Sequence, residues 1–318
     1  MSKKLLPLLI IFCSLGSARA QSKAESSVLN YYIGQNNKET RLYDFKDSDN
    51  MLMLKLKQLE QINLSRKKHG AKALKLDILA SRVANKMCRE AAENGYVGHW
   101  NLAGEKPYHR YAFAGGNDHI TENASGESSS AVFLRNNTAI GIMMHNNHLA
   151  FMNEKRPHDG HKQTVIDRNH NYVGLGFYIT DHNTAYYELY IDRYYQFEDV
   201  PASVKIGETI NLKCRPAEKQ YFSLLLAYFE KEPSPLSPRT ISSRSSYDDF
   251  SKDIAIQIPP WEINNYKEGE WYNFTLKFGK VGLYYIQIFS DSRPYKEGSR
   301  YSSDGKLQAS GIVIRVNK

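Results

Sequence analysis

A change of pattern at Pro201 constrains the fold more than any other feature of this 318-residue chain. Before it, apolar residues recur at the three- and four-residue spacing that is typical of amphipathic helices. After it come short β-branched or aromatic runs between turn residues, such as "YFSLLLAYF", "WYNFTLKF" and "GLYYIQIFS". One interval, "KEPSPLSPRTISSRSSYDD", is rich in Ser and Pro and is predicted to be a mobile insertion. The sequence therefore predicts an α+β unit followed by an all-β sandwich.

Helical periodicity in the first unit predicts three helices. The run from Met51 carries leucines at helical spacing and ends at a His-Gly pair, and Asp77 is a candidate N-cap for a second helix that ends at Gly95. A third run covers residues 131–153, and Pro157 prevents its continuation. Two strand-like segments joined by "DHN" then predict a hairpin, which makes this unit α+β.

The N-terminal residues have the features of an export signal. Two lysines precede an apolar segment, and Ala18-Arg19-Ala20 is a small-residue cleavage site, so cleavage is predicted after Ala20 in a secreted or periplasmic protein. The residues that follow are polar without a sustained period and are predicted to form an exposed arm. The expected division of the chain is signal peptide 1–20, N-terminal arm 21–48, α+β domain 49–197 and β-sandwich 200–318.

The charge of the chain is modest and evenly spread. Loss of the leader removes Lys3, Lys4 and Arg19 and no acid, which lowers the formal charge from +8 to +5. Because the remaining bases lie among acids, the sequence does not predict nucleic-acid binding. No later segment reaches the roughly 20 apolar residues that a membrane-spanning helix needs, so no transmembrane segment is expected.

Cys88 and Cys214 are the thiols that remain after cleavage, and they lie in different predicted domains. Since free cysteine is commonly buried, we predict two buried free thiols, with a disulfide between the domains as the alternative. Cys88 falls in the middle of a predicted helix, and no Gly-x-Ser-x-Gly elbow is present. The sequence therefore gives no support to hydrolysis through a covalent intermediate.

Short motifs in the first unit occur in an order that resembles a known family. Asn63 and Arg66 lie on the first helix, "HGAKALKLD" precedes the second, "NGYVGH" ends it, and Arg110 and "EN" at 122–123 follow. Farther on, "DGHKQTVIDRNHNYVGLGFYI" joins a Gly-His segment to a Val-Gly-x-Gly strand. Over about half of the chain these motifs resemble the CAP superfamily in its bacterial form (cysteine-rich secretory proteins, antigen 5 and pathogenesis-related-1 proteins; the SCP domain). The resemblance implies an α-β-α sandwich for the first unit, followed here by an immunoglobulin-like sandwich.

In that family two histidines and two acidic residues line a central cleft that has been linked to divalent-metal binding. Matching by motif assigns His99, Glu122, Glu154 and His161 to this tetrad, with Asp159 or no acid as the alternative to Glu154. Imidazoles and carboxylates suit Zn²⁺, so the resemblance makes His99 and His161 candidate ligands for Zn²⁺ or another divalent cation. Because the sequence lacks a His-x-x-x-His spacing, a hydrogen-bonded His-Glu network is the alternative.

The other histidines are interpreted as surface residues. His145 and His148 share a polar "HNNH" setting that favours a solvated helix face. His119 lies three residues before Glu122, which in a strand places the two side chains on opposite faces. The remaining histidines fall in expected loops: His109, His158, His170 and His182.

Three functions stay open. The leading hypothesis is an exported binding protein that takes a lipid or other small molecule in the cleft, with the sandwich as a spacer or as a contact for a cell-surface or protein partner. It assigns no catalytic residue. The alternative is a metal-dependent hydrolase of cell-wall or peptide substrates, with Glu122 as base. A third places the function in the sandwich alone.

Overall fold

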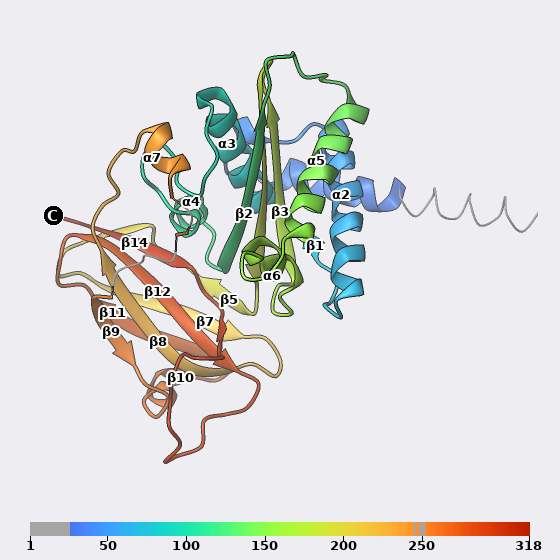
Figure 1. Ribbon diagram of the computed structural model, residues 1–318. Helices are drawn as coiled ribbons and strands as arrows, with labels where there is room; N and C mark the ends of the chain where they lie inside the picture. Colours follow the sequence, from blue (N-terminus) through green and yellow to red (C-terminus); the bar gives the residue numbers. More distant parts are fainter. Residues whose placement is uncertain (1–25, 245, 248–251) are drawn as a thin grey trace, which may run out of the picture.

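The structure is a computed structural model that describes residues 26–244, 246–247 and 252–318 (Figure 1). The expected signal peptide at residues 1–20 lies outside this part of the chain. Within the described residues, no helix combines the length and the apolar character needed to cross a membrane.

A four-stranded sheet forms the centre of the first unit, with its strands in the order β1-β3-β4-β2. β1 pairs with β3 in parallel, and the other neighbours are antiparallel. β3 and β4 form the expected hairpin, in which Ile179 lies opposite Thr184. β2 is an edge strand, so side chains from both faces of the sheet can meet beside it. The strands are β1 (Lys75–Leu76), β2 (His119–Ser128), β3 (Tyr172–Ile179) and β4 (Asn183–Asp192).

Helices cover both faces of this sheet, which gives the unit three layers, α-β-α (Figure 1). The apolar sides of α2 and α5 share one core with Val173 and Tyr190 of the sheet. The apolar sides of α3 and α4 share a second core with Leu189 and Ile191 on the other face. The predicted α+β class is confirmed. The helices are α2 (Asp49–Lys68), α3 (Ile78–Asn94), α4 (Pro107–Phe113), α5 (Asn137–Asn153) and α6 (Gly160–Ile166), with a 3₁₀ turn η1 (Tyr43–Phe45).

Local signals set the ends of α3 as predicted. The Asp77 carboxylate accepts a hydrogen bond from the Ala80 amide at 2.7 Å, and Gly95 takes the left-handed conformation with φ of 64°. The third predicted helix starts later than expected, since α5 begins only after Asn136, whose side chain accepts from the Ala139 amide at 2.9 Å. A polar cap, rather than the apolar pattern, therefore marks this boundary.

The described residues of the predicted N-terminal arm are mostly exposed or half-buried, but they are folded and attached to the first unit rather than free. Residues 26–38 form a helix. Asn36 is only 1% exposed and donates to the Asp47 carbonyl at 2.8 Å, while the buried Arg82 donates to the Asn36 carbonyl at 2.6 Å. Buried polar contacts attach this segment together with a short apolar stripe, since Leu29, Tyr32 and Ile33 pack against the core at helical spacing.

Two sheets of mostly antiparallel strands face each other in the second unit, as expected for a β-sandwich. Their inner faces share one apolar core that includes Leu212 and Phe274 from one sheet and Ile286 and Ile314 from the other. The first sheet has the order β10 (Lys267–Glu268), β11 (Trp271–Lys277), β7 (Thr209–Pro216) and β5 (Tyr195–Glu198). The second has the order β6 (Ser203–Lys205), β14 (Ile312–Asn317), β12 (Gly282–Asp291), β8 (Tyr221–Glu230) and β9 (Ile254–Ile258), with β13 (Leu307–Gln308) beside β12. Two short helical segments complete it: α7 (Pro238–Ser242) and the 3₁₀ turn η2 (Ile263–Tyr266).

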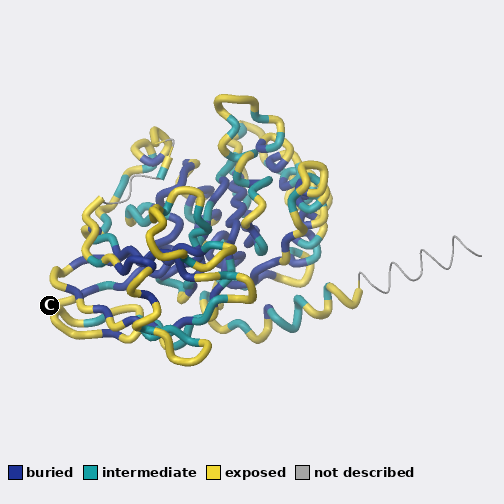
Figure 2. Tube along the Cα trace, turned by 90° about the horizontal axis from the view of Figure 1, so that it is seen from below, coloured by how far each residue is buried: buried dark blue, intermediate teal, exposed yellow. Residues whose placement is uncertain are grey.

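The two units are joined by a continuous buried contact rather than by a free linker. β5 pairs with β7, so the second unit begins near Tyr195, inside the range 49–197 expected for the first. The Tyr108 ring of α4 stacks on the Tyr285 ring of β12, with 4.1 Å between their centroids. Figure 2 shows buried residues running through both units while the exposed residues gather in the outer loops.

Candidate functional site

His99 and Glu122 form a buried pair on the α3 side of β2. The Nδ1 atom of His99 donates to Glu122 Oε1 at 3.0 Å, and Arg110 of α4 binds the other carboxylate oxygen of Glu122. Arg110 also donates to the His99 carbonyl at 2.5 Å. Burial disfavours the charged form of Arg110, but the adjacent Glu122 carboxylate outweighs burial and raises its pKa. This pair is thus tied to α4 by a charged side chain.

His161 and Glu154 form the second pair, on the α5 side of β2. The Nδ1 atom of His161 donates to Glu154 Oε1 at 2.5 Å, and the His161 amide donates to Glu154 Oε2 at 3.0 Å. Glu154 follows the last residue of α5, and His161 lies in the first turn of α6. Asp159 accepts instead from Gln163 at 2.7 Å. The structure therefore places Glu154, not Asp159, beside the second histidine.

The two pairs meet at the edge of the sheet. The rings of His99 and His161 lie 6.4 Å apart between centroids, although they come from opposite faces. Each ring has an aromatic neighbour: Phe151 lies 4.8 Å from His161, and Tyr247 lies 4.6 Å from His99. Both Nδ1 atoms are held by carboxylates, and no hydrogen bond within the described residues reaches either Nε2 atom. The site thus presents two fixed imidazoles side by side.

The chemistry of these residues does not fit a resident catalytic zinc ion. Such an ion is normally held by three protein ligands with one open position. Within the described parts of the chain, no group of three or more His, Cys, Asp and Glu residues is arranged to hold a metal. The tetrad instead forms two separate His-carboxylate pairs, which is the network that the sequence left as an alternative.

A segment of the second unit covers the His99 side of this site. The segment connects β8 to β9 and includes α7, whose Ile241 is fully buried against the first unit. The Glu122 amide donates to the Tyr247 hydroxyl at 2.8 Å, and the Arg244 guanidinium lies 4.7 Å from the centre of the Trp100 ring. The expected mobile insertion is therefore packed onto the first unit through these residues.

Tyr247→Ala is expected to uncover His99. Tyr247 shields one face of the His99 ring, so its removal should raise the rate at which diethyl pyrocarbonate modifies His99 several-fold, as measured by peptide mass spectrometry. The His161 side chain is already 35% exposed, so its rate serves as the internal reference. Tyr247→Phe keeps the ring and should leave the rate close to that of the wild type. Equal His99 rates in all three proteins would contradict the proposed cover.

Three histidines that the sequence placed on the surface are buried instead. His148 is fully buried and donates to Glu188 at 2.9 Å, because α5 turns this face toward the sheet. His109 lies on α4 and contacts Glu230 of the second unit at 2.7 Å. His170 donates to Asp192 at 2.6 Å. A polar local sequence concealed these partners, which are far away along the chain.

His119 contacts the other oxygen of Asp192 at 2.9 Å, so it lies outside the tetrad, as the strand geometry predicted. Burial disfavours the charged form of Asp192, but hydrogen bonds from His119 and His170 outweigh burial and lower its pKa to about 2. Because the pKa is lower in the folded state, Asp192 stabilises the fold above its unfolded value near 4. This stability is lost as the pH falls from about 4 to about 2.

Asp192→Asn is therefore expected to flatten the acid dependence of stability. The shift corresponds to about 2 kcal/mol of unfolding free energy. Urea unfolding between pH 5 and pH 2.5 should show the wild type losing roughly this amount more than the variant over that interval. If the unfolding free energies of the two proteins fell in parallel with pH, Asp192 would not be the source of the acid dependence.

Cys88 and Cys214 are free and buried, as predicted. Burial raises the pKa of both thiols above the ordinary value. Since the thiolate is the nucleophile, neither residue is suited to nucleophilic catalysis at neutral pH.

Sequence reasoning missed two residues of the site. Arg110 was noted as part of a motif, but its contact with Glu122 depends on how α4 packs against β2. Tyr247 lies 125 residues after Glu122 in the chain, and no local pattern marks it. In the sequence, Tyr247 was marked only as an aromatic residue within an interval rich in Ser and Pro.

No family model and no curated protein matches the chain. Among solved structures, an extracellular protein containing an SCP domain from Bacillus anthracis is 16% identical with a TM-score of 0.34, and the match covers 43% of this chain and 40% of that one. An outer surface protein from Borrelia burgdorferi is 19% identical with a TM-score of 0.33, covering 46% and 94%. A superoxide reductase (neelaredoxin) from Ignicoccus hospitalis is 15% identical with a TM-score of 0.21, covering 39% and 81%. Likenesses this distant and partial carry no functional assignment.

Proposed function

We propose that the chain is an exported binding protein whose first unit receives a small ligand at the edge of β2, between His99 and His161. The observation that supports this proposal is the pairing of two imidazoles from opposite faces of the sheet, each fixed through Nδ1 by its own carboxylate. Polar groups that are already held in place bind a ligand with a smaller loss of conformational entropy. The features of the first twenty residues support export.

The surroundings of the imidazoles favour a ligand that is partly apolar. Phe151 and Tyr247 lie against the two histidine rings. Phe151 is buried behind His161, so the half-buried Tyr247 ring is the aromatic surface that a bound molecule would meet beside His99. Most small-molecule sites combine apolar walls with a few fixed polar groups. The resemblance to the CAP superfamily agrees with a lipid or another small molecule. The second unit adds an exposed surface for a cell-surface or protein partner.

The geometry gives no support to the hydrolase alternative. A general base needs an oxygen that can accept a proton from water. Both oxygens of Glu122 are already engaged, one by His99 and the other by Arg110, and its side chain is fully buried. These contacts favour a role for Glu122 in holding the His99 ring in place.

Native mass spectrometry of residues 21–318 with palmitate or cholesterol tests the proposal. We expect at least one probe to bind the wild type with one-to-one stoichiometry. We expect the double variant His99→Ala/His161→Ala to lose that adduct, because it lacks the two Nε2 atoms that would contact the ligand. Removing two exposed histidines in His158→Ala/His182→Ala is the matched control and should leave binding intact.

Circular dichroism is used to check that both double variants remain folded. Binding that survives in the folded His99/His161 variant would place the ligand elsewhere on the protein. Failure of both lipids to bind the wild type would count against a small-ligand site at the β2 edge.

A further inference from the structure

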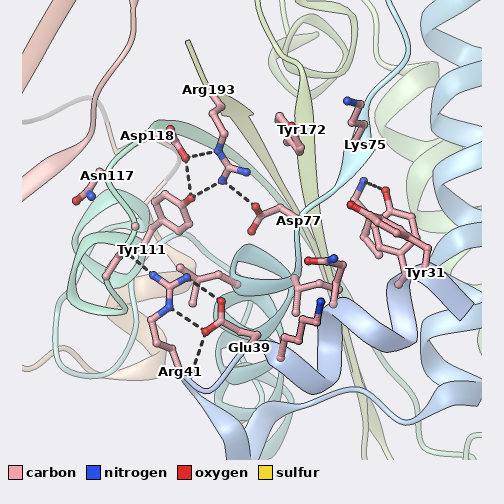
Figure 3. A pocket seen from close by; sticks show the side chains of 18 of the residues that line it. Tyr31, Glu39, Arg41, Lys75, Asp77, Tyr111, Asn117, Asp118, Tyr172 and Arg193 are labelled. Atoms are coloured by element: carbon pink, nitrogen blue, oxygen red, sulfur yellow. Dashed lines mark hydrogen bonds and ion pairs between the residues drawn. The ribbon is translucent and has the colours of Figure 1, made fainter. Parts of the chain in front are cut away.

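An open groove lies at the end of the first sheet where β3 and β2 begin and β4 ends. Its volume is about 1100 Å³, and none of the four tetrad residues lines it. Its walls include the helix of residues 26–38, the β1 region from Lys75 to Leu79, residues 115–118 before β2, and β5 of the second unit. Figure 3 shows Tyr31 and Lys75 on one side of the groove and Glu39 and Arg41 on the other.

Arg193 is held rigidly in the wall of this groove. Its Nε atom donates to Asp118 at 2.8 Å, and its Nη2 atom donates to Asp77 at 2.8 Å and to the Tyr111 hydroxyl at 3.3 Å. Its guanidinium lies 4.5 Å from the centre of the Tyr172 ring. No hydrogen bond within the described residues uses its Nη1 atom, and Figure 3 shows that nitrogen without a dashed contact. One oriented donor is thus left for a ligand.

Several other polar groups that line the groove have no hydrogen bond or ion pair from their side-chain ends within the described residues. They include amides, hydroxyl groups and two exposed amines: Gln35, Asn117, Tyr31, Tyr172, Lys38 and Lys75. Amides and hydroxyls both donate and accept hydrogen bonds, so they match ligand groups that do the same. The groove therefore offers many hydrogen-bonding positions along an extended surface.

The charges of the groove do not call for a charged ligand. Arg41 is paired with Glu39 at 2.7 Å, and Arg193 is balanced by two aspartates. Lys38 and Lys75 are exposed, where solvent and salt weaken their fields. Aromatic faces complete the lining, and a tyrosine ring offers an apolar face together with a polar hydroxyl.

An extended peptide cannot add to the sheet along this groove by backbone pairing at Leu76. Strand addition needs free backbone groups at an edge strand. The Leu76 amide of edge strand β1 already donates to the Tyr32 hydroxyl at 3.1 Å. Recognition in the groove must therefore use side chains, with aromatic faces and hydroxyl or amide ends.

We propose that this groove binds an uncharged oligosaccharide. Sugar rings present C–H faces that pack on tyrosine rings and hydroxyl edges that both donate and accept hydrogen bonds. Tyr31 supplies an exposed ring face. Tyr172, whose ring is contacted by Arg193 and Lys75, supplies its hydroxyl, while Arg193 Nη1 and the amides of Gln35 and Asn117 supply further polar contacts. The site does not depend on the tetrad or on its ligand.

Saturation-transfer NMR of residues 21–318 with maltohexaose, cellohexaose and chitohexaose tests this proposal, with hexaglutamate as a charged peptide probe. We expect at least one hexasaccharide to bind the wild type, and affinity to fall about tenfold in Tyr31→Ala and in Tyr172→Ala. Tyr31 is 60% exposed, so its truncation should not disturb folding. Tyr43→Ala is the matched control, because Tyr43 is 64% exposed and lies outside the groove.

Retained binding in Tyr43→Ala together with the loss in Tyr31→Ala would support the site. Binding of hexaglutamate alone, or no hexasaccharide signal at about 5 mM, would overturn it. Sugar binding that is unchanged in Tyr31→Ala and Tyr172→Ala would overturn it as well, since the sugar would then bind elsewhere.

Discussion

Gly174→Ala is expected to destabilise the protein by about 3 kcal/mol and to lower its Tm by roughly 6–12 °C. Gly174 lies on β3, where the sheet packs directly against the backbone of α3. A Cβ atom there would lie 2.4 Å from the carbonyl carbon of Ala80, far inside van der Waals contact. Because the clash is with backbone, relief requires α3 to move away from the sheet. Gly176 has the same relation to Ala84, at 2.5 Å, and Gly176→Ala should behave alike.

Gly34→Ala is the matched control for this prediction. Gly34 lies in the helix of residues 26–38, and a Cβ atom there meets nothing within 4 Å. Alanine favours helix more than glycine does, so this change should leave the Tm unchanged or slightly higher. Thermal unfolding followed by circular dichroism measures all three variants. A Gly174→Ala protein as stable as Gly34→Ala would show that α3 does not rest directly on β3.

Arg110→Met is expected to destabilise the protein by about 3–5 kcal/mol. The change leaves the Glu122 carboxylate buried, with His99 as its remaining side-chain partner among the residues that the structure describes. Glu122→Leu should cost a similar amount, because it leaves the Arg110 guanidinium buried without its counter-charge. Urea unfolding at pH 7 measures each cost.

The double variant Arg110→Met/Glu122→Leu tests whether the two side chains stabilise the fold as a charge pair or independently. If the two charges act as a pair, its cost should be well below the sum of the single costs, because no uncompensated charge remains buried. Additive costs would show that each residue stabilises the fold through other contacts.

Much of the first unit could be predicted because its signals are local. The N-cap at Asp77, the left-handed Gly95 and the β3–β4 hairpin follow from residues that lie within a few positions of one another. The sandwich was predictable from its short β-branched and aromatic runs. The N-terminal helix was not predicted, because its apolar stripe is only Leu29, Tyr32 and Ile33 and its other attachment is the buried polar contact of Asn36 with Arg82.

The sequence named the residues of the candidate site, but it did not predict how they are arranged. Motif order assigned His99, Glu122, Glu154 and His161, and the structure brings the two histidine rings to 6.4 Å. The division into two His-carboxylate pairs could not be foreseen, because it depends on helices that pack on opposite faces of one edge strand. The same limit explains why His148 was placed on the surface, since its partner Glu188 lies 40 residues away.

The sequence by itself determined the secondary-structure classes and the change of pattern near Pro201, because both depend on short-range periodicity, and the order of its motifs named His99, Glu122, Glu154 and His161 as candidates. Only the tertiary structure decided that Tyr247 covers His99, that Arg110 engages Glu122, and that a groove opens between the N-terminal helix and the second unit. These contacts join residues far apart in the chain, and their energies arise from burial and charge pairing that exist only after the layers have packed.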